Sequence, residues 1–264
     1  MPIPADGYPR AAAVSPRVQV RERTGSTNAD LVAAAAEAPG AWPHLSVLLT
    51  TDQTAGRGRL DRTWTTPPGS ALAVSVLVRV PAIPPAARGW IPLIAGAAMT
   101  RSIADRLRGS GHTVGLKWPN DVLIDGMKVC GILAEALAGD SDVVVIGSGV
   151  NTRMATADLP VPTATSFAAL RVDVDEDAML ADYLTNLDEL LTALGAAGGD
   201  AQKAGVHAQI EALCVTLGHG VAVTLPGGDV LRGRAQRIDA DGRLVVVEGD
   251  EETAVSAGDV VHVR

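Results

Sequence analysis

The stretch of sequence that decides the fold is VGLKWPNDVLIDGMKVCGILAEALAGDSDVVVIG, residues 114–147. A strand is expected at 114–118, and Asp125-Gly126 predicts a type I′ turn, because both central positions of this turn need a positive φ that Asp and Gly tolerate. Further strands are expected at 129–137 and 143–147. Consecutive hairpins favour a mainly antiparallel sheet with helices on one side, so the sequence predicts an α+β fold.

The sequence on either side of this stretch supplies the rest of a larger domain. Apolar patterns predict strands at 18–23, 46–51 and 71–80 and helices at 29–38, 93–107, 176–194 and 201–214. The Ser26-Thr27-Asn28 triplet offers capping residues for the first of these helices. The triplet is therefore expected at a strand-to-helix corner.

The character of the chain changes from Gly218 onward. Four short strands separated by Gly and Asp turns predict a small β-barrel, at 221–225, 231–238, 244–248 and 260–263. We therefore divide the chain into a loose N-terminal segment, a larger domain and a C-terminal domain, at 1–17, 18–216 and 217–264.

Composition and charge limit the possible functions. The chain has 264 residues and a net charge of −8, whereas a protein that coats nucleic acid needs a surplus of Lys and Arg. Any anion site must therefore be local. Residues 1–16 lack the basic start and apolar stretch of a signal peptide, and no apolar run approaches the roughly 20 residues that cross a bilayer. Two isolated cysteines match no metal spacing. These features predict a soluble cytoplasmic protein with no nucleic-acid or membrane partner.

Several familiar catalytic patterns do not occur in the sequence. It has no Gly-Lys pair for a Walker loop, and neither Gly56-Arg57-Gly58 nor Gly147-Ser148-Gly149 extends to a third dinucleotide-binding glycine. The five histidines show no metal-binding spacing, and Ser148 lacks the full spacing of a nucleophile elbow. A metalloenzyme with histidine ligands and a hydrolase triad are both disfavoured.

A glycine- and arginine-rich loop is the first candidate site. Gly56-Arg57-Gly58-Arg59 and Arg62 place three arginines beside two glycines, so that backbone amides and guanidinium groups can converge on a phosphate or carboxylate. A solvated basic loop is the simpler alternative. We expect residues 53–68 to be mobile without ligand.

The segment Lys117-Trp118-Pro119-Asn120-Asp121 is the second candidate. It gathers an ammonium, an indole, an amide and a carboxylate at the end of a strand, and the hairpin then brings Lys128 back beside them. Pro119-Asn120-Asp121 alone would more often be a plain turn. Only three lysines occur in the chain, and two of them are Lys117 and Lys128. A compact ammonium is therefore expected to matter here.

Five segments in this order resemble the ordered motifs of biotin protein ligases. They are Ser26-Thr27-Asn28, Gln53 to Arg59 (QTAGRGR), Lys117 to Asp121 (KWPND), Lys128 to Leu133 (KVCGIL) and Gly147 to Asn151 (GSGVN). The resemblance extends from about residue 18 to the C-terminus. It implies a catalytic domain related to class II synthetases, followed by an SH3-like barrel.

The resemblance also implies a role for individual residues. Lys128, Arg57, Arg59 and Asp121 would be catalytic, with Asp121 holding Lys117 or Lys128 or taking part in Mg²⁺ binding. Biotin would be bound by Ser26, Thr27, Asn28, Gln53, Gly56, Arg57, Gly58, Arg59, Lys128 and Gly131. ATP would be bound by Arg59, Arg62, Trp64, Lys117, Asn120, Gly149 and Asn151.

The activity implied is an ATP-dependent ligation. Biotin and ATP, with Mg²⁺, would form biotinyl-5′-AMP, and the biotin would pass to a lysine of a biotin carboxyl carrier domain. No tightly bound prosthetic group is expected, and the protein would be a monomer or weak homodimer. Only 25 residues precede Ser26, which resembles the short form of the family without a DNA-binding repressor domain. A lipoate ligase and a non-catalytic biotin or nucleotide sensor are the alternatives.

Overall fold

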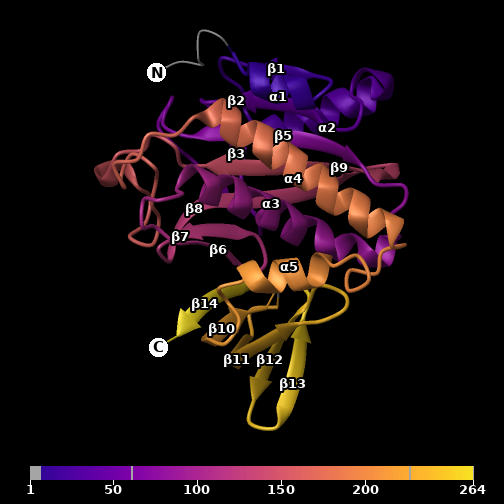
Figure 1. The fold of residues 1–264 in the computed structure, drawn as a ribbon, viewed down its shortest axis with the longest axis vertical. Coiled ribbons are helices and arrows are strands. Elements are labelled where there is room, and N and C mark those ends of the chain that lie inside the picture. Colours follow the sequence, from indigo (N-terminus) through magenta and orange to yellow (C-terminus); the bar gives the residue numbers. More distant parts are fainter. Residues whose placement is uncertain (1–6, 61, 226, 264) are drawn as a thin grey trace.

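A seven-stranded sheet forms the centre of the larger domain in the computed structural model, which describes residues 7–60, 62–225 and 227–263. In spatial order the strands are β1 (Val18–Val20), β2 (Ser46–Thr50), β5 (Leu72–Arg79), β9 (Asp140–Val150), β8 (Met127–Leu137), β7 (Asp121–Ile124) and β6 (Val114–Lys117). Strand β1 runs parallel to β2, and every other neighbouring pair is antiparallel (Figure 1). The predicted α+β class is confirmed.

The hairpin between β7 and β8 turns where the sequence predicts. Asp125 has a φ of 49° and Gly126 a φ of 78°, and Ile124 pairs with Met127. Positive φ at both central positions is the requirement of a two-residue type I′ turn. The turn pairs Lys128 with Leu123, and a register shift beyond this pair places Gly131 opposite Asp121, so that Lys128 comes back toward Asp121.

Helices cover both faces of the sheet, so the expectation of helices on one side is wrong. On one face lie α3 (Ile91–Arg106) and α4 (Glu176–Ala196), which bury the main apolar core (Figure 1). On the other face α2 (Thr27–Glu37) packs Leu31 and Ala35 against a smaller apolar cluster from β2, β5 and β9. The short elements are η1 (Pro39–Ala41), β3 (Gly56–Arg57), β4 (Thr63–Trp64), η2 (Pro85–Trp90), η3 (Thr156–Asp158) and α5 (Val206–Leu213).

The N-terminal segment is better ordered than the sequence suggests. Residues Pro9–Val14 form a helix, α1, which packs on α4. The backbone amides of Arg10 and Ala11 both donate to the Asp177 carboxylate at 2.9 Å. The expectation of a loose segment at 1–17 is therefore wrong for this helix, while residues 1–6 lie outside the described part of the chain. The helix expected at 201–214 is also shorter, because α5 begins at Val206.

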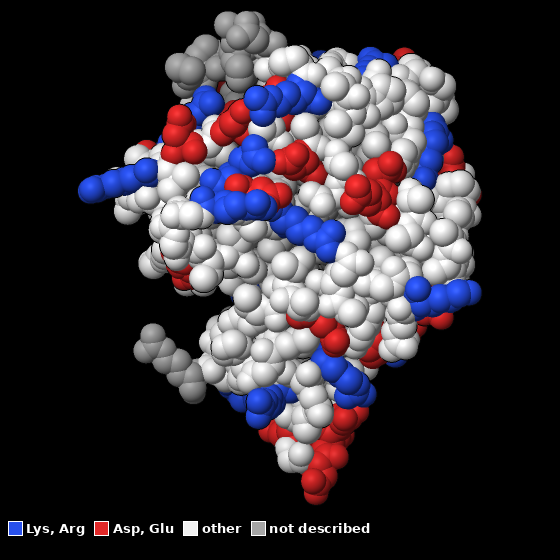
Figure 2. Space-filling view, viewed as in Figure 1, with Lys and Arg blue, Asp and Glu red and all other residues white. Residues whose placement is uncertain are grey.

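The C-terminal domain is an antiparallel sheet of five strands in the order β13-β12-β11-β10-β14. The strands are β10 (Gly220–Thr224), β11 (Val230–Ile238), β12 (Leu244–Glu248), β13 (Glu251–Val255) and β14 (Asp259–Val263). Strand β13 was not among the four expected. Figure 2 shows acidic side chains at the tip of this domain, where the β12–β13 hairpin carries Glu248, Asp250, Glu251 and Glu252.

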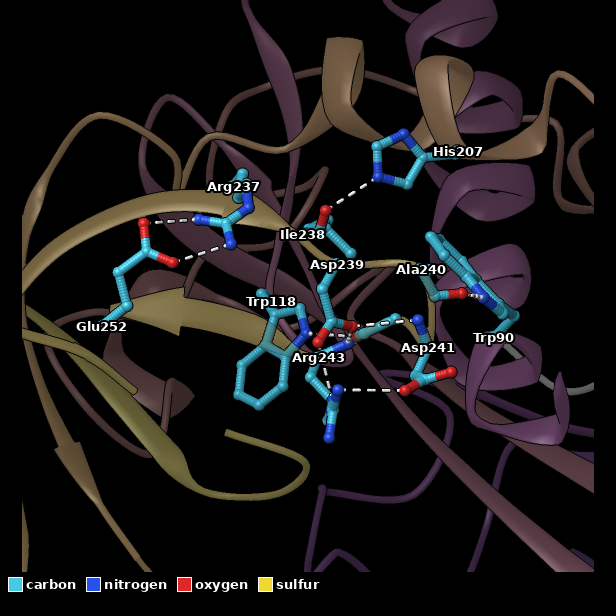
Figure 3. Close-up of polar contacts among 11 residues, drawn as sticks. Trp90, Trp118, His207, Arg237, Ile238, Asp239, Ala240, Asp241, Arg243 and Glu252 are labelled. Carbon is cyan, nitrogen blue, oxygen red and sulfur yellow. Dashed lines mark hydrogen bonds and ion pairs between the residues drawn. The ribbon is translucent and has the colours of Figure 1, made fainter. Parts of the chain in front are cut away.

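Two tryptophans of the larger domain fix the C-terminal domain through one of its turns (Figure 3). The Trp90 indole donates to the Ala240 carbonyl at 3.0 Å, and the Trp118 indole donates to the Gly242 carbonyl at 3.1 Å. Both indoles are buried. Buried indole N–H groups need such partners, so these two bonds hold the turn between β11 and β12 against the larger domain. No helix in the described ranges is long and apolar enough to cross a membrane.

Candidate active site

A cavity lies where the start of α2, the arginine-rich loop and strands β8 and β9 meet. The predicted residues that line it are Ser26, Thr27, Asn28, Gln53, Arg57, Gly58, Arg59, Arg62, Trp64, Asn120, Asp121, Lys128, Gly131 and Gly149. The C-terminal domain adds Gly258 and Asp259. All five sequence segments therefore contribute to one cavity, and Lys117 to Asp121 does so through Asn120 and Asp121.

The Ser26-Thr27 corner gives the cavity neutral hydrogen-bonding groups. Ser26 is the N-cap of α2, and its side chain accepts from the Ala29 amide at 3.4 Å. The Gln53 Oε1 atom accepts from the Thr27 amide at 2.7 Å and from the Thr27 hydroxyl at 3.0 Å. The Gln53 carbonyl oxygen is thus fixed, which leaves its amide nitrogen to serve the cavity.

Asn28 is the most firmly held residue of this corner. Its Nδ2 donates to the Leu133 carbonyl at 3.2 Å and to the Glu135 carboxylate at 2.8 Å, and its Oδ1 accepts from the Ser75 hydroxyl at 2.5 Å. A Cβ on Gly147 would lie 2.4 Å from Asn28 Oδ1. Asn28 is therefore bonded to the protein through both amide atoms and shapes the cavity floor.

Ser75 and Glu135 complete this network, and sequence reasoning missed both. Each carries a signal that was available, because a polar side chain interrupts an apolar strand in both places. Ser75 has no exposed surface and Glu135 is partly buried. Buried polar groups of this kind require partners, and the Asn28 amide supplies them.

The arginine-rich loop folds back on itself over the cavity. Strands β3 and β4 pair Gly56 with Trp64, and a Cβ on Gly56 would lie 2.4 Å from the Trp64 carbonyl. The Trp64 ring in turn lies on Gly149, where a Cβ would come within 2.8 Å of it. Gly56 itself does not line the cavity. Both glycines are needed because ring and backbone approach so closely.

Each arginine of the loop binds a different element. Arg57 pairs with Glu135 at 2.8 Å, Arg59 donates to the Asn120 side-chain oxygen at 2.8 Å, and Arg62 pairs with Asp259 at 2.6 Å. Burial lowers the pKa of Arg59, and the nearby carboxylates oppose this. The hydrogen bond to Asp259 raises the pKa of Arg62. The loop is thereby held across the cavity mouth by charged contacts.

Lys128 pairs with Asp121, with 2.6 Å between its Nζ and the Asp121 Oδ1. A Cβ on Gly131 would lie 3.0 Å from this Nζ, so the glycine clears the path of the lysine side chain. The backbone of Lys128 is also fixed, since its amide donates to the Thr163 carbonyl at 2.7 Å. Of the two partners expected for Asp121, the structure places Lys128 in contact.

Two predicted ATP-binding residues, Lys117 and Asn151, lie outside the cavity lining. The Asn151 side-chain Nδ2 donates to the Thr165 carbonyl at 2.9 Å and so anchors the segment after β9. Lys117 lies on β6 beside Asp259 and His262, where its charge lowers the pKa of both groups.

The buried thiol of Cys130 is a poor nucleophile. Burial raises the pKa of Cys130 to about 12, so its thiol stays neutral. Ser148 donates to the Tyr183 hydroxyl at 3.2 Å on the α4 side of the sheet. Among the described residues no group of three His, Cys, Asp or Glu side chains could hold a metal ion.

Comparison with known sequences agrees with this geometry. Residues 21–151 match the biotin/lipoate A/B protein ligase family, and residues 216–263 match the biotin protein ligase C-terminal domain. The chain is 40% identical to biotin–[acetyl-CoA-carboxylase] ligase of Mycobacterium tuberculosis over 94% of its own length and 90% of that protein. The chain belongs to the biotin protein ligase family.

Solved structures of biotin protein ligases share the fold. The Aquifex aeolicus enzyme in complex with biotin and ATP aligns with a TM-score of 0.73 at 21% identity, over 94% of this chain and 99% of that one. The Leishmania major enzyme in complex with biotinyl-5-AMP aligns with a TM-score of 0.60 at 22% identity, over 94% and 99%. The similarity therefore covers both domains of the fold.

Proposed function

We propose that the protein is an ATP-dependent ligase that joins biotin to a lysine of a biotin carboxyl carrier domain. One observation carries this proposal. A single cavity has neutral hydrogen-bonding groups around Thr27 and Gln53, and it also has the cations Arg59, Arg62 and Lys128. Neutral groups suit the ureido ring of biotin, and cations suit a carboxylate and phosphates.

In the first step the biotin carboxylate attacks the α-phosphorus of ATP, and pyrophosphate leaves. Two anions at about 4 Å repel by about 4 kcal/mol at an effective dielectric of 20. Lys128 would offset this repulsion: Asp121 holds its ammonium at the cavity, and Gly131 leaves room for it there. Arg57 and Arg59 are the further cations for the carboxylate and phosphates. A magnesium ion would enter with the nucleotide, and Asp121 is its candidate protein ligand.

In the second step the amine of the carrier lysine attacks the carbonyl of biotinyl-5′-AMP, and AMP leaves as the amide bond forms. The mixed anhydride hydrolyses in water, so the loop at 53–68 would exclude water until the carrier arrives. Gly58, which lines the cavity, would allow this loop to lie close to the ligand. We place the protein in the cytoplasm, as a monomer or weak homodimer.

The test is an assay of the purified protein with ATP, Mg²⁺ and biotin, with and without an apo carrier domain. We expect biotin-dependent release of pyrophosphate, and AMP release with carrier labelling when the acceptor is present. Lipoic acid replaces biotin in a parallel reaction. If lipoic acid is turned over as fast as biotin or faster, the protein is a lipoate ligase and not a biotin ligase. If neither biotin nor lipoic acid stimulates pyrophosphate release, the protein is a non-catalytic binding protein.

A further inference from the structure

The C-terminal domain supplies a carboxylate to the cavity. Asp259 begins β14, lines the cavity beside Gly258 and pairs with Arg62 at 2.6 Å. A Cβ on Gly258 would lie 2.6 Å from the Val223 side chain, so the glycine lets β14 start close against β10. The position of Asp259 is therefore fixed by the backbone of its own sheet.

The position of this sheet on the larger domain is fixed as well. Besides the Trp90 and Trp118 indoles, the His207 ring contacts the Ile238 carbonyl at 2.8 Å (Figure 3). The Ile238 amide also donates to Glu211 at 3.1 Å. These contacts join backbone groups of one domain to side chains of the other. Asp259 thus contacts the arginine-rich loop from a domain whose position is fixed.

More positive than negative charge surrounds Asp259. Arg59, Arg62 and Lys117 all lower its pKa, the largest effect being the hydrogen bond from Arg62. Two carboxylates, Asp121 and Asp259, thus lie among four cations. The cations are Arg59, Arg62, Lys117 and Lys128. A triphosphate carries more negative charge than one carboxylate and can bind several of these cations at once.

The contact between Arg62 and Asp259 is suited to exchange. The side chains are 60% and 42% exposed, and ion pairs of this kind contribute little net stability. A contact that is weak by itself can order the loop in the empty protein and still be displaced when nucleotide enters.

We propose that Asp259 is a positioning residue of the nucleotide site. It holds Arg62 at the cavity before nucleotide binds, and Arg62 exchanges this contact for the phosphates when ATP binds. This inference rests on the proposed function and adds a residue from the C-terminal domain to it. Asp259 and the polyphosphate compete for the same cations, so nucleotide binding releases Arg62 from Asp259.

The experiment compares wild type with Asp259→Asn, which keeps the side-chain shape and removes the charge. We expect the Kd of a non-hydrolysable ATP analogue and the KM for ATP to fall about three- to tenfold, because a competing state is removed. The KM for biotin should stay unchanged. Amide exchange at residues 56–60 and 62–64 should accelerate in the ligand-free variant and slow again with nucleotide.

Glu252→Gln is the matched control. It breaks a bidentate pair with Arg237, at 3.0 and 2.8 Å, in the same domain but outside the cavity lining. Nucleotide affinity and loop exchange should match wild type. Arg62→Gln provides a second measurement if Asp259→Asn folds poorly: it should loosen the loop in the same way but raise the Kd for nucleotide, because a phosphate-binding cation is lost.

An unchanged or higher Kd for nucleotide in folded Asp259→Asn would overturn the proposal, as would unchanged loop exchange. These outcomes are distinct from failure of the proposed function. If wild type releases no pyrophosphate with biotin but Asp259→Asn binds the analogue more tightly, the ligase proposal fails and the role of Asp259 stands. If wild type is an active ligase and the variant binds nucleotide like wild type, only the role of Asp259 fails.

Discussion

The floor of the cavity and the loop across its mouth are built in different ways. The floor is a buried network in which Asn28 bonds to Ser75, Leu133 and Glu135. The loop is held by contacts of three arginine side chains, of which Arg57 and Arg62 are 45% and 60% exposed and Arg59 is partly buried. Buried polar networks rigidify a structure when every member has a partner, whereas exposed ion pairs are weak and exchangeable.

This difference separates two tasks of one site. A fixed floor can select a neutral ring system before any reaction occurs, because its groups are already oriented. A loop held by exchangeable contacts can open for substrates and close over an unstable intermediate. Substitutions confined to the floor or to the loop should therefore have separable effects.

Lys128→Ala should have the largest effect. The ammonium of Lys128 is held beside the cavity by Asp121. In the proposed mechanism it offsets the repulsion between carboxylate and phosphate, so its loss should lower the adenylation rate by roughly 10² to 10³. Biotin-dependent pyrophosphate release measures this. Lys203→Ala is the control, since Lys203 is exposed and lies outside the cavity lining. A near-normal rate in Lys128→Ala would remove the lysine from the mechanism.

Gly147→Ala should damage the floor without touching the loop. The added Cβ would lie 2.4 Å from Asn28 Oδ1, so the Asn28 network must shift. Overpacking of this kind costs about 1–3 kcal/mol of unfolding free energy, and we expect the KM for biotin to rise about tenfold, equivalent to about 1.4 kcal/mol. Gly40→Ala, with no heavy atom within 4 Å of its Cβ, is the control. Equal stability of the two variants would contradict the account of a rigid floor.

The sequence predicted those parts of the site that local patterns determine. The Asp125-Gly126 turn follows from the φ requirement of its two residues, and it places Lys128 beside Asp121. Ser75 and Glu135 left a weak signal as polar residues in apolar strands. Asp259 left none, because its partner Arg62 is 197 residues away in sequence and only the packing of two domains brings them together.

The elements that were missed depend on tertiary contacts rather than on propensity. Helix α1 has six residues, too few to be stable alone, and its contacts with Asp177 and α4 stabilise it. Strand β13 begins with Glu251 and Glu252, which have low strand propensity, and it forms because β12 offers a partner. Trp118 was expected only as part of a motif, and its indole binds the C-terminal domain.

Glu135→Gln should weaken the connection between floor and loop. Glu135 accepts from the Asn28 amide and pairs with Arg57, so the variant keeps an acceptor but loses a charge. Hydrogen bonds to charged groups contribute about 1.5–3 kcal/mol, and because this one is partly exposed we expect a rise in the biotin KM of about fivefold. A double-mutant cycle with Arg57→Gln checks the pair. Strict additivity would show that Arg57 does not depend on Glu135.

His262 should produce the smallest effect, as a pH dependence of the C-terminal domain. Its pKa is lowered from the ordinary value of 6.5 by burial, then by Lys117 and by His219, whose ring stacks on it at 5.3 Å. The unfolded chain therefore binds a proton at higher pH than the folded chain. The stability that His262 contributes is complete above the unfolded pKa and is lost as the pH falls from there through the lower folded pKa.

Calorimetry of wild type and His262→Gln between about pH 7 and pH 5 measures this effect. The Tm of wild type should fall more on acidification than that of the variant, because glutamine takes up no proton. Since the ring is only half buried, solvent screening keeps the difference small. A steeper fall in Tm for His262→Gln would mean that protonated His262 stabilises the contact between the two domains. The packing of β14 against the larger domain would then strengthen in acid rather than weaken.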